Sequence, residues 1–371
     1  MKDTTRPGPA RTSLVGLGAE EIAALPALAG QPPFRARQIA AWIYRKGALE
    51  FSAMTNLSGA LRGRLAEGHT LERLPVLARE TAPYGSARKF LFGTQDGRTF
   101  EAVLLRALDR DTICASTQIG CAWRCAFCAT GAMGWQRDLT PHEILSQVLV
   151  IRDALRELGT EGFFNLVFMG MGEPLANYDA LVHSIRVLQS DFGLGVGRRR
   201  MTVSTVGLPD RIRQLSHEKV AVRLAISLNA TDNETRSKLM PVNRVHPIEA
   251  LLPAVIEYRE RTGQRVTFEY VLIDGVNDSL EDARRLAQLA RQCDCKINLI
   301  RLNAHPLSAL RPPSAERATA FYDELLPIAP AVTIRESRGQ EILAACGQLS
   351  TAYGTGTAGA GGAGTGSGAS G

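Results

Sequence analysis

The regular alternation of short apolar runs with amphipathic segments beyond residue 111 is the feature that most constrains the fold. Apolar runs of this length predict buried strands, and amphipathic segments predict helices that cover them. The expected strands are residues 113–118, 163–169, 201–206, 222–228, 265–273 and 296–302. The expected helices between them are residues 141–158, 178–191, 209–216, 248–262 and 279–293. Six successive β/α units with right-handed crossovers predict parallel strands that curl into a partial barrel, an α/β fold.

The chain before this region has a different pattern. Helical periodicity with many arginines predicts a small helical module, and Asp96-Gly97 between two β-type runs predicts a hairpin. A helix at 314–326 and a strand at 332–337 are expected to complete the globular region. The predicted organisation is a disordered leader (1–18), a helical module (19–74), a hairpin extension (75–110), the partial barrel (111–349) and a Gly/Ala/Ser/Thr-rich disordered tail (350–371).

The net charge of +6 is concentrated near the N-terminus. Residues 1–100 contain 14 Lys and Arg against 8 Asp and Glu, so the other residues are balanced. This excess is either a solvated basic face or a surface that contacts phosphates, because cationic patches provide the non-specific part of nucleic-acid affinity. Charge alone does not separate the two interpretations.

Membrane and secretory signals are not evident in the sequence. It has no run of eighteen apolar residues and no charged leader with a cleavage site, so we expect a cytoplasmic protein without a membrane span. The seven cysteines are an odd number, and four of them fall between Cys114 and Cys128, which is unlike a secreted disulfide framework.

Three cysteines, Cys121, Cys125 and Cys128, lie in one short stretch at spacings of four and three. Three thiolates can hold three corners of an iron–sulfur cube and leave the fourth iron open for chemistry. A zinc knuckle with a distant fourth ligand is the alternative, but such sites usually contain two Cys or Cys/His pairs. The six histidines lack ligand spacing and are interpreted as surface or capping residues.

The spacing of these cysteines, with Phe127 before the last one, resembles the radical S-adenosylmethionine (SAM) superfamily. The resemblance implies a 4Fe-4S cluster whose open iron binds the amino and carboxylate groups of SAM. An electron from the cluster then cleaves SAM to a 5′-deoxyadenosyl radical.

Small polar residues follow several of the expected strands, where the active residues of a parallel barrel lie. The glycine-rich turn at Gly172-Glu173 resembles the superfamily's GGEP element, and its carboxylate suits the ammonium group of SAM. Singly, each of the others could be only a strand cap or a turn former. The candidate SAM-binding residues are Gly172, Glu173, Ser204, Ser227, Leu228, Asn229 and Asn303.

Two further cysteines, Cys114 and Cys346, define the kind of radical enzyme. Either one alone would be interpreted as a small buried apolar residue. Between residues 34 and 349, however, the sequence resembles the RlmN/Cfr group of radical SAM RNA methyltransferases. The resemblance rests on Phe-Arg-Ala-Arg-Gln-Ile, Met-Thr-Asn-Leu-Ser, Gln-Ile-Gly-Cys, Arg-Asp-Leu-Thr, Ser-Leu-Asn-Ala and Ala-Ala-Cys-Gly-Gln-Leu.

The resemblance implies a mechanism for methylating an electron-poor adenine carbon, which cannot attack the methyl group of SAM directly. Cys346 takes a methyl group from one SAM, the radical from a second SAM removes a hydrogen from it, and the resulting methylene radical adds to carbon 2. Glu101 matches the family's proton acceptor, and Cys114 releases the product by forming a disulfide with Cys346.

The implied partners are 23S rRNA and an anticodon-loop adenine of tRNA, with an electron donor such as flavodoxin, and we expect a monomer. Methylation at carbon 8 of the ribosomal adenine is the nearest alternative activity. An RNA-binding protein with a structural cluster, or an unrelated radical SAM lyase or activase, would have no use for Cys114, Cys346 and Glu101 together.

Overall fold

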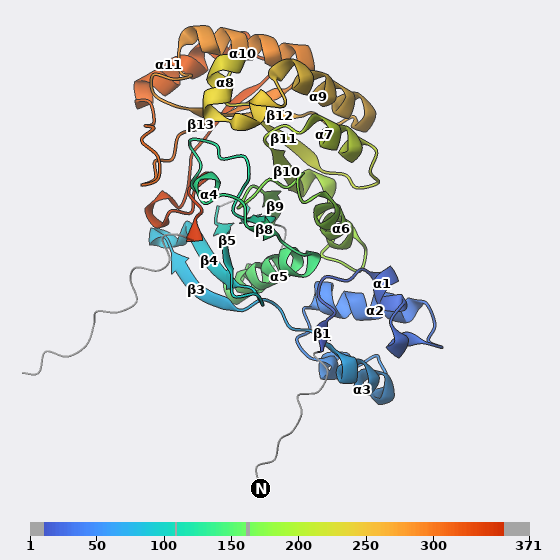
Figure 1. The fold of residues 1–371 in the computed structure, drawn as a ribbon. Helices are drawn as coiled ribbons and strands as arrows, with labels where there is room; N and C mark the ends of the chain where they lie inside the picture. The colour runs from blue at the N-terminus through green and yellow to red at the C-terminus, as the bar shows by residue number, and fades with distance from the viewer. Residues whose placement is uncertain (1–10, 108–109, 161–163, 352–371) are drawn as a thin grey trace, which may run out of the picture.

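A ten-stranded sheet forms the centre of the protein in a computed structural model that describes residues 11–107, 110–160 and 164–351 (Figure 1). Neighbouring strands in the largest part of the sheet run parallel. In sheet order these are β6 (Thr112–Cys114), β9 (Asn165–Phe168), β10 (Met201–Thr205), β11 (Arg223–Ser227), β12 (Thr267–Leu272), β13 (Lys296–Arg301) and β14 (Val332–Arg335). The predicted partial barrel is confirmed, and β14 adds a seventh parallel strand.

The first barrel strand is shorter than the predicted span of 113–118. It ends at Cys114, and the predicted span continues into a separate strand, β7 (Gln118–Ile119), which pairs antiparallel with β8 (Arg137–Asp138). The reason is that the Gln147 side chain bonds both the N–H and the carbonyl of Ser116, which takes these groups away from the sheet. The first residue of the second predicted strand, 163, lies outside the described residues.

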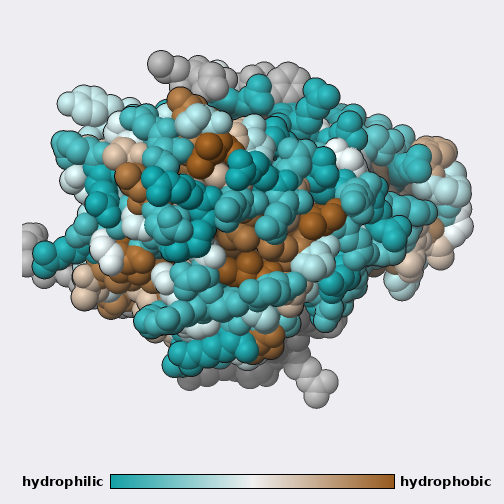
Figure 2. Space-filling view, turned by 90° about the horizontal axis from the view of Figure 1, so that it is seen from above, coloured by the Kyte–Doolittle hydropathy of each residue, from teal (hydrophilic) through white to brown (hydrophobic). Residues whose placement is uncertain are grey.

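Helices cover the outer side of the parallel strands (Figure 1). They are α5 (Pro141–Glu157), α6 (Tyr178–Gln189), α7 (Pro209–Ser216), α9 (Ile248–Thr262), α10 (Leu280–Cys293) and α11 (Ala315–Leu325). All six were predicted to within two residues at each end, whereas the short helices α4 (Ala129–Ala132) and α8 (Asn233–Leu239) were not, because they are too short to show a period. Figure 2 shows the side on which α10 and α11 lie, where hydrophilic residues surround a small central apolar area. Among the described residues, no helix is both long and apolar enough to cross a membrane.

The predicted hairpin is present but is part of a larger element. Strands β4 (Ala87–Gly93) and β5 (Thr99–Leu105) flank the turn at Asp96-Gly97, and β5 pairs antiparallel with β6. An additional strand, β3 (Val76–Thr81), pairs with β4. Five of its six residues are exposed, so it lacks the apolar pattern that would have predicted it. Strands β3, β4 and β5 therefore extend the barrel sheet, so this region does more than link two domains.

The N-terminal module begins earlier than the predicted residue 19. Strand β1 (Thr12–Ser13) pairs with β2 (His69–Thr70), and Leu14 and Val15 are fully buried, so these residues belong to the module rather than to a leader. Residues 1–10 lie outside the described part. The module's main helices are α1 (Ala19–Ala23), α2 (Phe34–Ala41) and α3 (Gly59–Gly68).

The module contacts the barrel through polar groups. His142 of α5 and His183 of α6 bond the carbonyls of Val15 and Gly16, at 2.9 and 2.7 Å. Arg152 of α5 donates to the carbonyl of Tyr44, in the single π-helical turn η2 (Trp42–Lys46) that follows α2. These bonds join the module to the outer helices, away from the inner surface of the sheet.

Residues 338–350, here called the closing segment, run from β14 back against β4 and β5 (Figure 1). Lys89 of β4 donates to the carbonyl of Ile342 at 2.8 Å, and the N–H of Ser350 donates to Glu101 of β5 at 2.9 Å. Ser350 is fully buried, so the predicted start of the tail at residue 350 is wrong. Residues 352–371 lie outside the described part.

Candidate functional site

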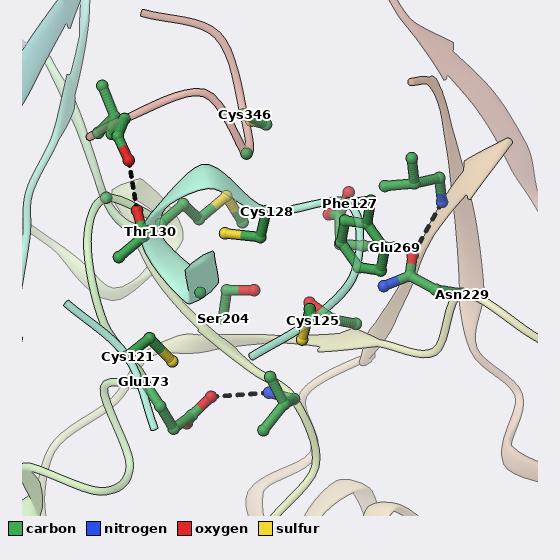
Figure 3. Close-up of a pocket in the computed structure, with 18 of the residues that line it drawn as sticks. Cys121, Cys125, Phe127, Cys128, Thr130, Glu173, Ser204, Asn229, Glu269 and Cys346 are labelled. Carbon is green, nitrogen blue, oxygen red and sulfur yellow. Dashed lines mark hydrogen bonds between the residues drawn. The ribbon is translucent and has the colours of Figure 1, made fainter. Parts of the chain in front are cut away.

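The loop between β7 and β8 carries Cys121, Cys125 and Cys128. All three line one cavity at the C-terminal ends of the parallel strands (Figure 3). The loop is held at its base by the β7–β8 pairing, and within the loop the N–H of Ala126 donates to the carbonyl of Leu239 at the end of α8. The sheet and the outer helices therefore fix where the three thiols point.

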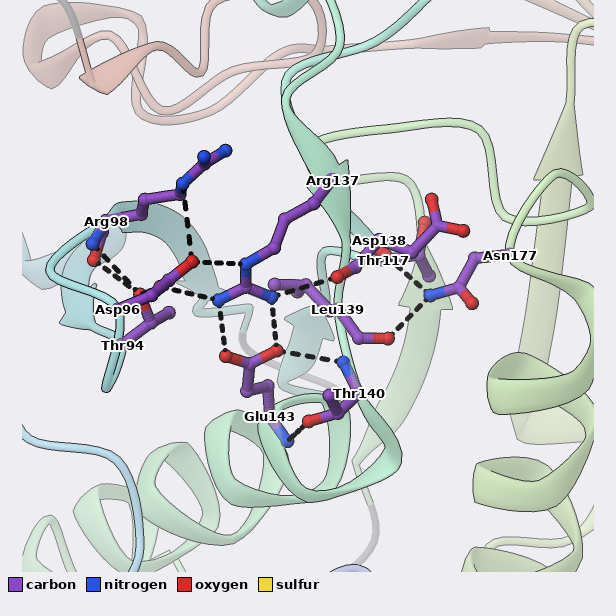
Figure 4. A network of polar contacts seen from close by, with 10 residues as sticks. All are labelled: Thr94, Asp96, Arg98, Thr117, Arg137, Asp138, Leu139, Thr140, Glu143 and Asn177. Carbon is purple, nitrogen blue, oxygen red and sulfur yellow. Dashed lines mark hydrogen bonds and ion pairs between the residues drawn. The ribbon is translucent and has the colours of Figure 1, made fainter.

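Arg137, directly after the cysteine loop, anchors it on two sides (Figure 4). Its guanidinium bonds Asp96 in the β4–β5 turn and both carboxylate oxygens of Glu143 in the first turn of α5, at 2.8 to 2.9 Å. Glu143 also forms a capping box with Thr140. Hydrogen bonding to Arg137 holds the pKa of Asp96 well below its usual range. The network joins the hairpin, the loop and α5 into one unit.

Cys121 is buried and Cys125 and Cys128 are half-buried, and the desolvation of each thiol raises its pKa, to about 12 for Cys121. No three His, Cys, Asp or Glu side chains within the described residues converge closely enough to bind a single metal ion. A cubane cluster makes a different demand, because each thiolate binds a different iron atom. Three thiols on one cavity wall therefore fit such a cluster and do not fit a mononuclear zinc site.

Gly172 and Glu173 lie in the turn after β9, beside the cysteine loop. Gly172 has φ of +98°, and a Cβ there would lie 2.4 Å from that of Gln118, so only glycine is accommodated. The N–H groups of Leu175 and Val206 donate to the two carboxylate oxygens of Glu173, at 3.0 and 2.8 Å. Burial raises the pKa of Glu173 to about 7, and these bonds oppose the shift. The carboxylate therefore has a fixed orientation on the cavity wall.

Most of the other predicted SAM-binding residues also line this cavity: Ser204, Ser227, Asn229 and Asn303. Leu228 does not, because its side chain is fully buried in the core. Asn303 donates to the carbonyl of Cys346, whereas its Oδ1 is buried without a hydrogen-bond partner among the described residues. An orphaned acceptor in a cavity wall suits a donor from a bound molecule, such as the amine or hydroxyl groups of SAM.

Cys346 lies on the closing segment and lines the same cavity as Cys121, Cys125 and Cys128. The loop around it is held by Asn303, by a 2.7 Å bond from the N–H of Ala129 to the carbonyl of Gly347, and by Thr130, which donates to Leu349. Cys346 also lines a second, smaller cavity, whose wall includes Cys114. Both thiols are free in this structure. Burial raises the pKa of Cys114 to about 12.

The chain matches two family models. Residues 12–71 match the ribosomal RNA large subunit methyltransferase N-terminal domain, and residues 116–287 match the radical SAM superfamily. The curated dual-specificity RNA methyltransferase RlmN of Syntrophobacter fumaroxidans is 44% identical over 88% of this chain and 94% of the relative. The chain belongs to the RlmN family.

Other relatives agree with this assignment. The dual-specificity RNA methyltransferase RlmN of an Anaeromyxobacter species is 45% identical over 95% of this chain and 94% of the relative. The crystal structure of a radical SAM methyltransferase from Sphaerobacter thermophilus superposes with a TM-score of 0.86, with 45% identity over 91% of this chain and 99% of that one. The protein is therefore an RNA methyltransferase of the radical SAM superfamily, as the sequence predicted.

Glu101, which the RlmN resemblance predicts to be the proton acceptor, is buried on β5 behind the closing segment. It accepts the N–H of Ser350 and lies 3.3 Å from the Nζ of Lys89. Burial raises the pKa of Glu101, and Lys89 opposes the shift. Unlike Cys346, Glu101 is not among the residues that line the larger cavity.

Several residues in this RlmN-family site were missed from sequence. Glu269 and Arg335 line the larger cavity from β12 and β14. A charged residue inside an apolar strand could have indicated Glu269. His305 was interpreted as a surface or capping residue, but it is buried and bonds the carbonyl of Phe127 in the cysteine loop at 3.1 Å. Its role as a loop anchor depends on a tertiary contact that no local pattern reveals.

Proposed function

We propose that this protein methylates carbon 2 of an adenine in 23S rRNA, and of an anticodon-loop adenine in tRNA, through a methylated Cys346. The observation that carries the proposal is the position of Cys346, which lines both the cavity with the three cluster thiols and the cavity with Cys114. A carrier thiol must meet both the methyl donor and its resolving partner, and this position gives access to both.

We assign Cys121, Cys125 and Cys128 as the ligands of a 4Fe-4S cluster. When bound, the cluster would supply the electron that cleaves SAM to a 5′-deoxyadenosyl radical, and would take back the electron that the adenine adduct must lose together with its carbon-2 proton. Gly172, Glu173 and Asn303 are assigned to SAM, together with Ser204, Ser227, the backbone of Leu228 and Asn229. The fixed carboxylate of Glu173 supports binding of the SAM ammonium group, and the orphaned Oδ1 of Asn303 accepts a further donor.

Cys346 acts first as a nucleophile. Its thiolate attacks the methyl carbon of SAM, so that a new carbon–sulfur bond forms, the bond from that carbon to the sulfonium sulfur breaks, and S-adenosylhomocysteine leaves. The side chain of Asn303 and the N–H of Ala129 donate to the carbonyls of Cys346 and Gly347, which supports a carrier thiol held at the wall of the cavity that Cys121, Cys125 and Cys128 also line. Removal of a hydrogen atom from this methyl group gives a carbon radical. The radical can add to an adenine carbon that is too electron-poor for direct methyl transfer.

Glu101 and Cys114 complete the reaction. Glu101 accepts the proton from carbon 2 of adenine, and its raised pKa suits a group that must take and keep a proton. The thiolate of Cys114 then attacks the sulfur of Cys346. A disulfide forms, the bond from sulfur to the transferred carbon breaks, and that carbon keeps the electron pair and takes a proton.

The RNA must present its adenine in the barrel mouth, which requires a flipped-out or unpaired base. We assign binding of the RNA sugar–phosphate backbone to the basic N-terminal module, here residues 12–74. In the proposed organisation, residues 75–110 are a sheet extension and residues 111–350 are the catalytic barrel. The proposal includes a low-potential electron donor such as flavodoxin, a monomeric enzyme, and a cytoplasmic location where its RNA substrates are found.

The test is anaerobic incubation of cluster-reconstituted protein with reductant, methyl-labelled SAM and unmodified 23S rRNA or tRNA fragments, followed by mass spectrometry of nucleosides. We expect labelled 2-methyladenosine together with 5′-deoxyadenosine. Labelled 8-methyladenosine would instead assign carbon-8 methylation. SAM cleavage without any methylated adenine would contradict the proposed substrate.

A further inference from the structure

Arg236, in the short helix α8, is an arginine with no exposed surface. Its guanidinium donates to the carbonyls of Leu228, Val206, Ser227 and His246 and to the side-chain oxygen of Asn243, at 2.7 to 3.4 Å. Every one of these acceptors is neutral. Among the described residues, no carboxylate forms an ion pair with Arg236.

A buried cation without a counter-charge is costly, because carbonyl dipoles replace only part of its hydration. Arg152 shows the usual solution in this protein. It is also buried, at 5% exposure, but its guanidinium lies 2.6 Å from the carboxylate of Asp153. The comparison indicates that Arg236 is kept for a negative charge other than a carboxylate of the described residues.

The surroundings of Arg236 identify where that charge would lie. Two of its acceptors, Val206 and Ser227, line the cavity that contains Cys125. Three residues after Arg236, the carbonyl of Leu239 accepts the N–H of Ala126, the neighbour of Cys125. Arg236 therefore lies behind the cavity wall, beside the middle cysteine of the loop.

The charge state of Arg236 agrees with this position. Burial lowers the pKa of Arg236 to about 10, and a thiolate at Cys125 opposes the shift. The arginine remains protonated near neutral pH. A 4Fe-4S cluster bound by three thiolates has a net charge of about −1, which becomes about −2 on reduction, and nearby charge is one of the factors that set its potential.

We propose that Arg236 is a positioning residue for the cluster, whose buried charge stabilises the reduced state and so raises the reduction potential. The inference rests on the proposed cluster but not on the identity of the RNA substrate. It predicts that the charge of Arg236 matters for electron transfer, in addition to its hydrogen bonds that hold α8 against β10 and β11.

The test is a redox titration of reconstituted protein followed by electron paramagnetic resonance. In R236M we expect the ratio of reduced to oxidised cluster at a fixed low potential to fall at least tenfold, which corresponds to 59 mV for one electron. R236K keeps the charge and should stay within threefold of the wild-type ratio. R152M is the matched control: it removes another buried arginine and should lose stability without changing the ratio.

A second variant keeps the test decisive if R236M does not fold. N243D places a carboxylate at the atom that accepts from Arg236 at 2.9 Å, so it neutralises the charge while retaining the arginine. We expect the ratio to fall at least threefold in this variant. The inference would be overturned by unchanged ratios in both R236M and N243D, or in N243D alone if R236M does not fold. That result would leave the proposed methylation intact. Wild-type protein that binds no cluster would overturn both.

Discussion

The two cysteine-bearing walls of the cavity are held in different ways. The loop with Cys121, Cys125 and Cys128 is closed at its base by strand pairing and anchored by the bidentate bonds of Arg137. The closing segment with Cys346 has no strand pairing and is held by separate hydrogen bonds to β4, β5, α4 and Asn303. A cluster needs ligands in fixed positions, whereas a methyl carrier must meet several partners in turn. The difference in anchoring matches the two roles that we propose for these walls.

The largest expected effect is the loss of methylation when the cysteine of either wall is replaced, and the two walls should differ in whether the cluster is lost as well. C346A should reduce RNA methylation at least about 1,000-fold, because the carrier nucleophile is lost, while the cluster absorbance stays near the wild-type level. C125A should lose the cluster absorbance as well as the activity. Ultraviolet–visible spectra and nucleoside mass spectrometry of the two variants provide the measurement. Methylation by C346A would contradict the carrier mechanism.

Glu101 accepts a hydrogen bond from the closing segment, so its variant tests the chemistry proposed for that wall. E101Q should lower methylation roughly 100-fold or more, as expected for the loss of a general base. Intact-protein mass spectrometry should still detect methylated Cys346, since that step precedes proton removal. E80Q is the control, because Glu80 also lies 3.3 Å from Lys89 but is mainly exposed. Equal losses in both variants would indicate that only the Lys89 ion pair matters.

The rigid wall can be probed at Gly172. G172A should lower the free energy of unfolding by about 3 kcal/mol or more, because the residue has positive φ and the added Cβ overlaps Gln118. G85A changes a glycine with φ of +68° and no atom within 4 Å, and should cost only about 1 kcal/mol. Urea unfolding of the two variants measures the difference. Similar losses of stability in G172A and G85A would show that the wall can shift to accommodate the alanine side chain.

The closing segment can be loosened at Gln348, which donates to the carbonyl of Ala304 and accepts the N–H of Ala345. Q348A leaves both groups unpaired at a cost of about 1–3 kcal/mol. Amide hydrogen exchange in residues 343–350 should accelerate by roughly 10-fold or more, with no change in residues 120–136. Q214A, at an exposed glutamine, is the control. Equal acceleration in the cysteine loop would mean that the two walls move together.

The smallest expected effect concerns Glu269, whose pKa is raised by burial and lowered in part by Arg335 and by a 2.6 Å bond from Asn298. The folded state holds this proton to higher pH than the unfolded chain, so the stabilising contribution is complete at acid pH. It is lost as the pH rises through the folded-state pKa. Wild-type protein should therefore lose stability relative to E269Q as the pH rises above about 4.3, the ordinary pKa of a glutamate side chain. A constant difference in urea midpoints would contradict the shift.

The sequence was sufficient to predict the barrel and the grouping of three cysteines at one cavity, because both depend on local patterns. The helices are long and periodic, and the cysteine spacing lies within one loop. The positions of Cys346 and Glu101 relative to the cavity could not be predicted in the same way. They depend on how the closing segment returns across β4 and β5, and the two residues are far apart in the chain.

Arg236 illustrates the same limit. In Asn233-Glu-Thr-Arg-Ser-Lys-Leu it lies among charged and polar neighbours, a pattern typical of an exposed helix. Its burial follows from the way α8 packs beneath the ends of β10 and β11, where five acceptors converge on one guanidinium. Only tertiary structure separates this arginine from those on the surface.

The position of Cys346 between two cavities also suggests a route to inhibition. The smaller cavity, which Cys114 and Cys346 both line, has a volume of about 20 Å³, enough for about one water molecule. A compound therefore has no room beside Cys114, but a small thiol-reactive electrophile could reach Cys346 from the larger cavity. Under the proposed mechanism, blocking Cys346 in this way would stop the enzyme before the methyl group is transferred.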